Sequence, residues 1–398
     1  MYLTREEERI LQGEEGEAKA LALRLIVRVG EALGADRLIP IAHAHASGIS
    51  YDNIGEPGLG FIRRLAESGG RVSVFSTYNP AGISFYDDSP VNRYPDLLEK
   101  QMELIRYLER MGFRRSATCI PYLERPPGRG EHLAWGESSA VAVANSLYAA
   151  RSNREGGPLA LAAALAGRTY HWGLHLEENR KPRVLVRVEA QLPGEVEAGL
   201  LGYLLGKTVP GDKVAYIDTG STVLEKRQAI SLCAAAAASG STAMCVVKRL
   251  SPEDNGPPAE PEEKLGIDRE EIARAREELS TASLEEAELF FTGCPHHDPE
   301  AVLAKLELLL ERYGTPRKPV WIAVPGYLAP KLAPRARRLR EQNIVLLPGT
   351  CLVVTRAKGL VDAIATDSVK TAFYMARRHG VGVALANLEE FMRANASQ

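Results

Sequence analysis

The chain has 398 residues, with 49 basic and 51 acidic side chains and a formal net charge of −2. This balance argues against nucleic-acid binding, and the acidic N-terminal segment lacks the basic and apolar regions of a secretory signal. Because no apolar run reaches the roughly 18 residues that a membrane-spanning helix needs, we expect a cytoplasmic protein that binds neither nucleic acid nor membrane.

The first predicted element is an N-terminal helix. Thr4 followed by Glu7 forms a capping-box pattern, and the helix is expected to continue to about Gly34. The rest of the chain alternates helical patterns with short apolar runs, which is typical of α/β proteins. The expected strands are residues 71–75, 184–188, 214–217, 243–247, 289–291, 320–324, 344–347 and 361–365.

One segment departs from this alternation. Residues 251–266 are rich in proline, glutamate and glycine and poor in large apolar side chains, which predicts a surface loop or linker. We therefore expect two α/β regions, residues 1–250 and residues 267–398, on either side of this segment.

The five cysteines fall into two groups. No two of them form a CxxC pair, so a disulfide framework is not expected in a cytoplasmic protein. Cys233 and Cys245 lie in an alanine-rich helical pattern and an apolar run, where buried thiols are ordinary. Cys119, Cys294 and Cys351 lie beside proline or glycine, and the last two follow expected strands. Their thiols should project from loops at strand ends, where α/β sheets place ligands.

The three loop cysteines are separated by 175 and 57 residues, which suits an iron–sulfur cluster held from different loops. Three thiolates leave one iron of a [4Fe-4S] cluster open, and an open metal can polarise a substrate hydroxyl. On spacing alone, ordinary buried thiols and a zinc site remain alternatives. Structural zinc sites usually have closely spaced ligand pairs, and His296 and His297 are adjacent, which hampers both from facing one ion.

Other candidate site residues precede or begin helices. Ser138 and Ser139 precede a helix expected at residues 140–151, so their backbone N–H groups could hold an anion or simply cap the helix. Lys370 is expected in the first turns of a helix and could reach an anionic group. His43 and His45 would point to one face of a strand. Such a pair can bind metal or move protons, but one imidazole bonded to a backbone carbonyl is commoner, so we do not assign them as ligands.

Several motifs, in their order along the chain, resemble the aconitase X family. They are IAHAHASGISYDNIGEPG (41–58), STYNPAGISFYD (76–87), CIPYL (119–123), GEHLAWGESSAVAVANS (130–146), ARSNREGGPLALAAALAGRTYHWGLHL (150–176), TGCPH (292–296), GTC (349–351) and TDSVK (366–370). The resemblance implies an aconitase-like fold, with multi-layer α/β/α domains around a central iron–sulfur site, and hydro-lyase activity.

The sequence is most similar to the separate large subunits found in archaea. These dehydrate (R)-5-phosphomevalonate, a phosphorylated hydroxy acid of the mevalonate pathway, to trans-anhydromevalonate 5-phosphate. Fused members carry a further domain, and this sequence ends at Gln398 without one. The resemblance therefore implies a small swivelling-domain subunit as a heterodimer partner, and a serine base on that partner rather than a catalytic base in this chain. A cis-3-hydroxy-L-proline dehydratase and a non-enzymatic iron–sulfur binding or sensing protein are the alternatives.

The resemblance also implies site residues. Cys119, Cys294 and Cys351 match the cluster ligands, in agreement with the loop argument, and the cluster is implied to be [4Fe-4S], with [2Fe-2S] as the alternative. Two N-terminal candidate loops, residues 48–50 and residues 79–80, match segments that look like substrate-binding loops in the family. Without the resemblance, both would be interpreted as plain turns. The expected substrate-binding residues are Gly48, Ile49, Ser50, Asn79, Pro80, Ser138, Ser139 and Lys370.

Overall fold

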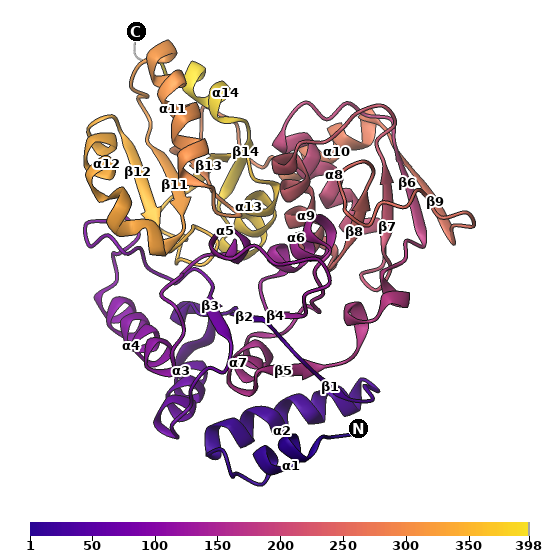
Figure 1. Cartoon of the computed structure of the whole chain (residues 1–398). Coiled ribbons are helices and arrows are strands. Elements are labelled where there is room, and N and C mark those ends of the chain that lie inside the picture. The colour runs from indigo at the N-terminus through magenta and orange to yellow at the C-terminus, as the bar shows by residue number, and fades with distance from the viewer. Residues whose placement is uncertain (397–398) are drawn as a thin grey trace.

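The computed structural model describes residues 1–396. Its strands form three parallel sheets and one two-stranded antiparallel ladder, and helices pack against them (Figure 1). In Figure 1 the first sheet along the chain lies below, the second lies to the right and the third lies at the upper left. This architecture confirms the predicted α/β class. Within the described residues, no helix has both the length and the apolarity to span a membrane.

The N-terminal helix is interrupted, so the prediction of one continuous helix was wrong. Thr4 and Glu7 form the predicted capping box on α1 (Arg5–Leu11), and α2 spans Glu17–Ala32. Between them, Gly13 and Gly16 have φ angles of 92° and 96°. This left-handed backbone cannot continue an α-helix.

The first sheet has the strand order β3-β2-β4. Its strands are short, and the expected strand at residues 71–75 lies slightly later in the chain, as β3. The antiparallel ladder β1-β5 connects this region to the N-terminal helices. The elements are β1 (Leu38–Pro40), β2 (His43–Ala46), α3 (Tyr51–Glu67), β3 (Phe75–Tyr78), α4 (Pro95–Met111), α5 (Pro121–Glu124), β4 (Leu133–Trp135), α6 (Ser138–Tyr148), α7 (Gly157–Ala166) and β5 (Arg168–Tyr170).

The second sheet has the strand order β8-β7-β6-β9. Strand β9 (Glu263–Ile267) pairs with β6 (Val184–Val188). The prediction that residues 263–266 lie in a loop was therefore wrong, because the end of the expected linker forms an edge strand of this sheet. Because its side chains are mostly exposed, β9 lacks the apolar pattern of a buried strand. The remaining elements are η1 (Gly173–His175), η2 (Glu177–Arg180), α8 (Glu195–Thr208), β7 (Ala215–Asp218), α9 (Lys226–Gly240), β8 (Cys245–Val247) and α10 (Arg269–Leu279).

The third sheet has the strand order β12-β11-β10-β13-β14. From the central β10 (Leu289–Thr292) the chain proceeds outward through β11 and β12 and then returns to β13 on the other side. Such a reversal of strand order opens a crevice at the carboxyl ends of the strands, where α/β sheets bind ligands. The remaining elements are α11 (Pro299–Tyr313), β11 (Val320–Val324), η3 (Gly326–Leu328), α12 (Ala329–Glu341), β12 (Ile344–Pro348), β13 (Ala363–Thr366), α13 (Val369–Tyr374), the π-helix η4 (Met375–His379), β14 (Gly382–Leu385) and α14 (Leu388–Ala394).

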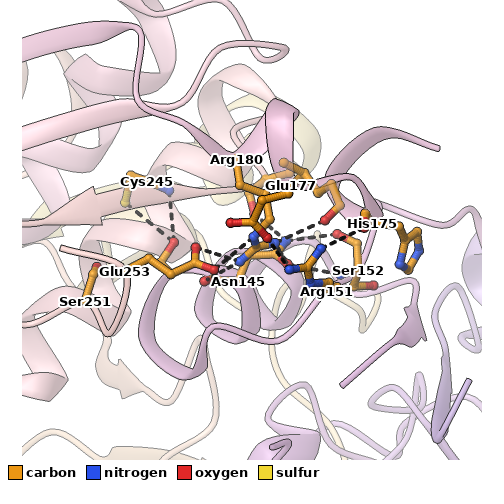
Figure 2. A network of polar contacts seen from close by, with 12 residues as sticks. Asn145, Arg151, Ser152, His175, Glu177, Arg180, Cys245, Ser251 and Glu253 are labelled. Atoms are coloured by element: carbon orange, nitrogen blue, oxygen red, sulfur yellow. Dashed lines mark hydrogen bonds and ion pairs between the residues drawn. The ribbon is translucent and has the colours of Figure 1, made fainter. Parts of the chain in front are cut away.

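The parts of the chain that carry the first, second and third sheets are called the first, second and third regions below. A buried polar network joins the first and second regions (Figure 2). Arg180 at the end of η2 is only 3% exposed. Its guanidinium donates to the Glu253 carboxylate at 2.9 and 3.1 Å, to Asn145 of α6 at 3.3 Å and to the Leu174 carbonyl at 3.1 Å. Because Glu253 lies in the segment after β8 and Asn145 lies in α6, one buried cation connects three separate parts of the chain.

Candidate functional site

Two of the three loop cysteines lie at strand ends, as predicted, and the third lies before a helix. Cys294 follows β10 and Cys351 follows β12, and their exposed fractions are 6% and 4%. Cys119 lies just before α5 and is 5% exposed. The loops that carry these thiols come from the first and third sheets, whereas Cys233 and Cys245 lie together in α9 and β8, with their sulfurs 4.0 Å apart.

One histidine connects all three cysteine loops. The backbone N–H of His296, two residues after Cys294, donates to the Cys119 sulfur at 3.2 Å. The His296 ring contacts the Thr118 hydroxyl through Nδ1 at 3.4 Å and the Thr350 carbonyl through Nε2 at 3.0 Å. Because Thr118 and Thr350 immediately precede Cys119 and Cys351, the three thiols converge on one place in the fold.

The donor set is suited to a cluster rather than to a single ion. Cys294 and Cys351 interact directly, and this contact lowers the pKa of Cys294 and raises that of Cys351. Burial raises the pKa of Cys119. No group of three His, Cys, Asp or Glu side chains within residues 1–396 is placed to hold one metal ion. In an iron–sulfur cluster each thiolate can bind a separate iron, so the sulfurs need not share one ion.

Glu137 assembles three of the predicted substrate-binding residues. Its carboxylate accepts the Lys370 ammonium at 2.6 Å and the Ser139 hydroxyl at 2.9 Å through Oε1, and the Asn79 amide at 2.7 Å through Oε2. Lys370 also donates to the Ser139 hydroxyl at 3.2 Å. All four residues are at most 9% exposed. The structure therefore brings Asn79, Ser139 and Lys370 together around a carboxylate that we did not predict from the sequence.

The Glu137–Lys370 pair is a buried ion pair beside the cysteines. Burial would raise the pKa of Glu137, but Lys370 and the other donors lower it to about 2. Burial likewise disfavours the charged Lys370, but Glu137 raises the pKa of the ammonium group. Glu137 also raises, and Lys370 lowers, the pKa values of Cys119 and Cys294. Both partners are thus charged at neutral pH, and both lie within electrostatic reach of two thiols.

The N-terminus of the helix predicted after Ser139 is already capped by another residue. Helix α6 begins at Ser138, and the carboxylate of its N-cap residue, Glu137, accepts the Ser139 backbone N–H at 3.3 Å. Ser138 is half-buried, and its side chain makes no hydrogen bond within residues 1–396. The cap is therefore the preceding carboxylate rather than a serine hydroxyl.

The two N-terminal candidate loops pack against the loop of Cys351. Ser50, the N-cap residue of α3, donates to the Val354 carbonyl at 2.8 Å, and the Ile49 carbonyl accepts the Gln101 amide at 2.7 Å. Gly48 has a φ of 67°, so the turn before α3 favours glycine.

Pro80 lies in the second of these loops. The residue after it, Ala81, donates its N–H to the Gly349 carbonyl at 2.8 Å and accepts the Thr350 hydroxyl at 2.7 Å. Gly48, Ile49, Ser50 and Pro80 thus lie in loops that are fixed against the third region.

A cavity of about 360 Å³ opens beside Cys294. Its lining includes residues 293–298, Asp367, Ile120 and Tyr122. The cavity therefore borders the loop of Cys294, whereas Glu137 and Lys370 do not line it.

Three family models match the chain in succession. They describe the first domain of aconitase X at residues 1–178, the second domain at residues 182–277 and the third domain at residues 287–397. Each matched range contains one of the three parallel sheets.

Two phosphomevalonate dehydratase large subunits match nearly the whole chain. The phosphomevalonate dehydratase large subunit of Aeropyrum pernix is 41% identical over 98% of both chains, and that of Thermococcus kodakarensis is 39% identical over 99% of both. The cis-3-hydroxy-L-proline dehydratase of Pseudomonas aeruginosa is 33% identical over 72% of this chain and 50% of its own length. The holo-form crystal structure of Thermococcus kodakaraensis aconitase X superposes with a TM-score of 0.91 at 37% identity, and the match covers 99% of this chain and 100% of that one. The chain therefore belongs to the aconitase X family.

Proposed function

We propose that the chain is the large subunit of a dehydratase that converts (R)-5-phosphomevalonate to trans-anhydromevalonate 5-phosphate. The observation that carries the proposal is the convergence of three buried cysteines beside the Glu137–Lys370 ion pair. The relatives that match over nearly their full length are named phosphomevalonate dehydratase large subunits, whereas the hydroxyproline dehydratases match over 50% or 35% of theirs. This difference favours the phosphorylated substrate.

Cys119, Cys294 and Cys351 would hold an iron–sulfur cluster, which we propose to be [4Fe-4S]. The chemistry of the donor set fits, because three buried thiols converge from separate loops and the other two cysteines lie elsewhere in the fold. When bound through three thiolates, such a cluster supplies an open Lewis-acid iron for a substrate hydroxyl.

The protein side chains would bind and orient the substrate. Lys370 offers a positive charge to a carboxylate or phosphate, and the Asn79 amide and the Ser139 hydroxyl offer hydrogen bonds. Glu137, with a pKa of about 2, remains an acceptor at neutral pH and cannot serve as a general acid there. We assign removal of the carbon-bound proton to a serine of a small-subunit partner, since none of these groups is a free base.

Anaerobic co-expression with the small subunit tests the function. We expect the complex to dehydrate phosphomevalonate, and we expect neither the isolated large chain nor the complex given cis-3-hydroxy-L-proline to show activity. Activity of the isolated chain would refute the two-subunit proposal, and turnover of hydroxyproline alone would refute the substrate.

Cysteine substitutions test the ligand assignment separately. Cys119→Ser, Cys294→Ser and Cys351→Ser should each remove activity and the visible absorbance of a thiolate-bound cluster. Cys233→Ser is the matched control, because it replaces an equally buried thiol outside the site. Full absorbance in all three loop variants would refute the assignment.

A further inference from the structure

A continuous chain of buried hydrogen bonds leads through the first sheet to Glu137. His43 and His45 lie on the same face of β2, and Thr77 on β3 is directly opposite His45. The Thr77 hydroxyl oxygen lies 2.7 Å from His43 Nε2 and 2.7 Å from His45 Nδ1. His45 Nε2 lies 2.8 Å from Asn79 Oδ1, and Asn79 Nδ2 donates to Glu137 at 2.7 Å.

Because Glu137 is ionised, the donor and acceptor of every bond in this chain can be assigned. An ionised carboxylate only accepts, so Asn79 must present its N–H₂ to Glu137 and its oxygen to His45. His45 must then carry its proton on Nε2, and its bare Nδ1 accepts the Thr77 hydroxyl. The Thr77 oxygen in turn accepts a hydrogen bond from the N–H of His43 Nε2. His43 Nδ1 is left bare, and it has no hydrogen-bond partner within residues 1–396.

The surroundings hold both imidazoles neutral and fixed. His43, His45 and Thr77 are fully buried, and burial lowers the pKa of both histidines, that of His45 to about 4. The Trp135 ring packs edge-on against both, with centroids 5.2 and 6.3 Å away, and the Phe75 ring packs against His43 at 4.8 Å. Neither ring can rotate freely to exchange its two nitrogens.

We propose that His45, supported by Thr77 and His43, is a positioning residue that fixes the amide orientation of Asn79 and thereby the geometry of Glu137 and Lys370. The inference rests on the proposed function, because the orientation of Asn79 matters only if this site binds substrate. A flipped amide would turn its oxygen toward the Glu137 carboxylate and its donors away from it. A purely space-filling role would not require any of these directional bonds.

Thr77→Val and Thr77→Ser form a matched pair of variants that separates positioning from packing. Valine keeps the branched shape but removes the hydroxyl that bridges the two histidines, whereas serine keeps the hydroxyl. In the complex with its small subunit, we expect Thr77→Val to lower kcat on phosphomevalonate about 10-fold with unchanged iron content, because a small misplacement of site groups slows turnover strongly. Thr77→Ser should restore most of the activity.

Several outcomes would overturn the inference. One is a wild-type kcat in Thr77→Val. Another is a loss of kcat in Thr77→Ser equal to that in Thr77→Val, because an equal loss would indicate a packing effect. An inactive wild-type complex would instead refute the proposed function.

A spectroscopic measurement decides the question even if Thr77→Val does not fold. In the wild-type complex with ¹⁵N-labelled histidine, NMR should show His43 and His45 as neutral rings protonated at Nε2. A proton on Nδ1 of His45 would overturn the inference.

Discussion

Glu137 shows how a single carboxylate can organise a site. It caps α6, neutralises Lys370 and accepts a hydrogen bond from the Asn79 amide. The sequence pointed instead to the two serines that follow it, because serine is the commoner N-cap residue and no pattern reveals which distant lysine a carboxylate will meet. The one sequence feature that pointed to Glu137 was its position directly after a short apolar run and before a small-residue helix.

Replacing Glu137 tests the ion pair itself. Glu137→Gln should lower the free energy of unfolding by about 3 kcal/mol, because the buried Lys370 loses its partner. Denaturant unfolding of the purified chain measures the change. Glu300→Gln is the control, since Glu300 pairs with Lys331 at the surface, and it should change stability by less than about 1 kcal/mol. An equal loss of unfolding free energy in the two variants would contradict the role of Glu137 as the partner of a buried Lys370.

Glu155 predicts a pH dependence of stability. Its carboxyl group is 3% exposed and accepts the hydroxyls of Thr169 and Tyr170 at 3.0 Å. Burial raises its pKa from 4.5 to about 7. Between these values the unfolded chain ionises while the native carboxyl stays protonated, so the contribution of Glu155 to stability is present below pH 4.5 and declines as the pH rises to about 7.

The expected decline is about 3 kcal/mol across this interval, since each pKa unit corresponds to about 1.4 kcal/mol. Denaturant unfolding of wild type and Glu155→Gln at pH 5 and pH 8 isolates the contribution. Relative to wild type, the free energy of unfolding of Glu155→Gln should be higher at pH 8 than at pH 5. The same difference at both pH values would show that Glu155 is not protonated in the folded chain.

At the scale of elements, the sequence predicted the buried strands better than the short or exposed ones. The expected ranges 184–188 and 320–324 coincide with β6 and β11, because continuous apolar runs mark strands that are buried on both faces. The first sheet was harder to predict, since β2 and β3 carry histidine, serine and threonine whose partners come from other strands. The break at Gly13 and Gly16 was missed for a different reason, since isolated glycines are tolerated within helical patterns.

The packing of α8 on α9 depends on the absence of a side chain. A Cβ added at Gly202 would collide with the Leu232 carbonyl of α9. Gly202→Ala should therefore destabilise the chain by about 2 kcal/mol, as overpacking does. Gly60 in α3 has nothing within 4 Å of its added Cβ, and Gly60→Ala should instead stabilise by up to about 1 kcal/mol. Thermal unfolding of both variants measures the contrast, and a neutral Gly202→Ala would contradict the close packing.

At the scale of the whole molecule, the site belongs to no single sheet. The thiols of Cys119, Cys294 and Cys351 come from the first and third regions, and Glu137 and Lys370 do as well. Loop position suggested the three cysteines as ligands, and family resemblance strengthened that interpretation. Their convergence through His296 could not be predicted, because it depends on how two sheets dock rather than on local pattern.

The network around Arg180 should control how the first and second regions hold together (Figure 2). Arg180→Met leaves the Glu253 carboxylate and the Asn145 carbonyl without their donor, and we expect a loss of about 3 kcal/mol. Arg183→Gln is the control, because Arg183 forms a half-exposed pair with Glu262. Limited proteolysis of the segment that follows residue 180 should be faster in Arg180→Met than in the wild type. In Arg183→Gln the rate should not change. Equal protection in both variants would contradict the role of the network.

The division of the three cysteines between two sheets has a consequence for biosynthesis. Cys351 leaves the ribosome long after Cys119, so a nascent chain cannot complete the ligand set during most of its synthesis. If the cysteines hold a cluster as proposed, no cluster with all three ligands can form before Cys351 has been synthesised. A chain whose synthesis stops before that point would therefore lack the complete site.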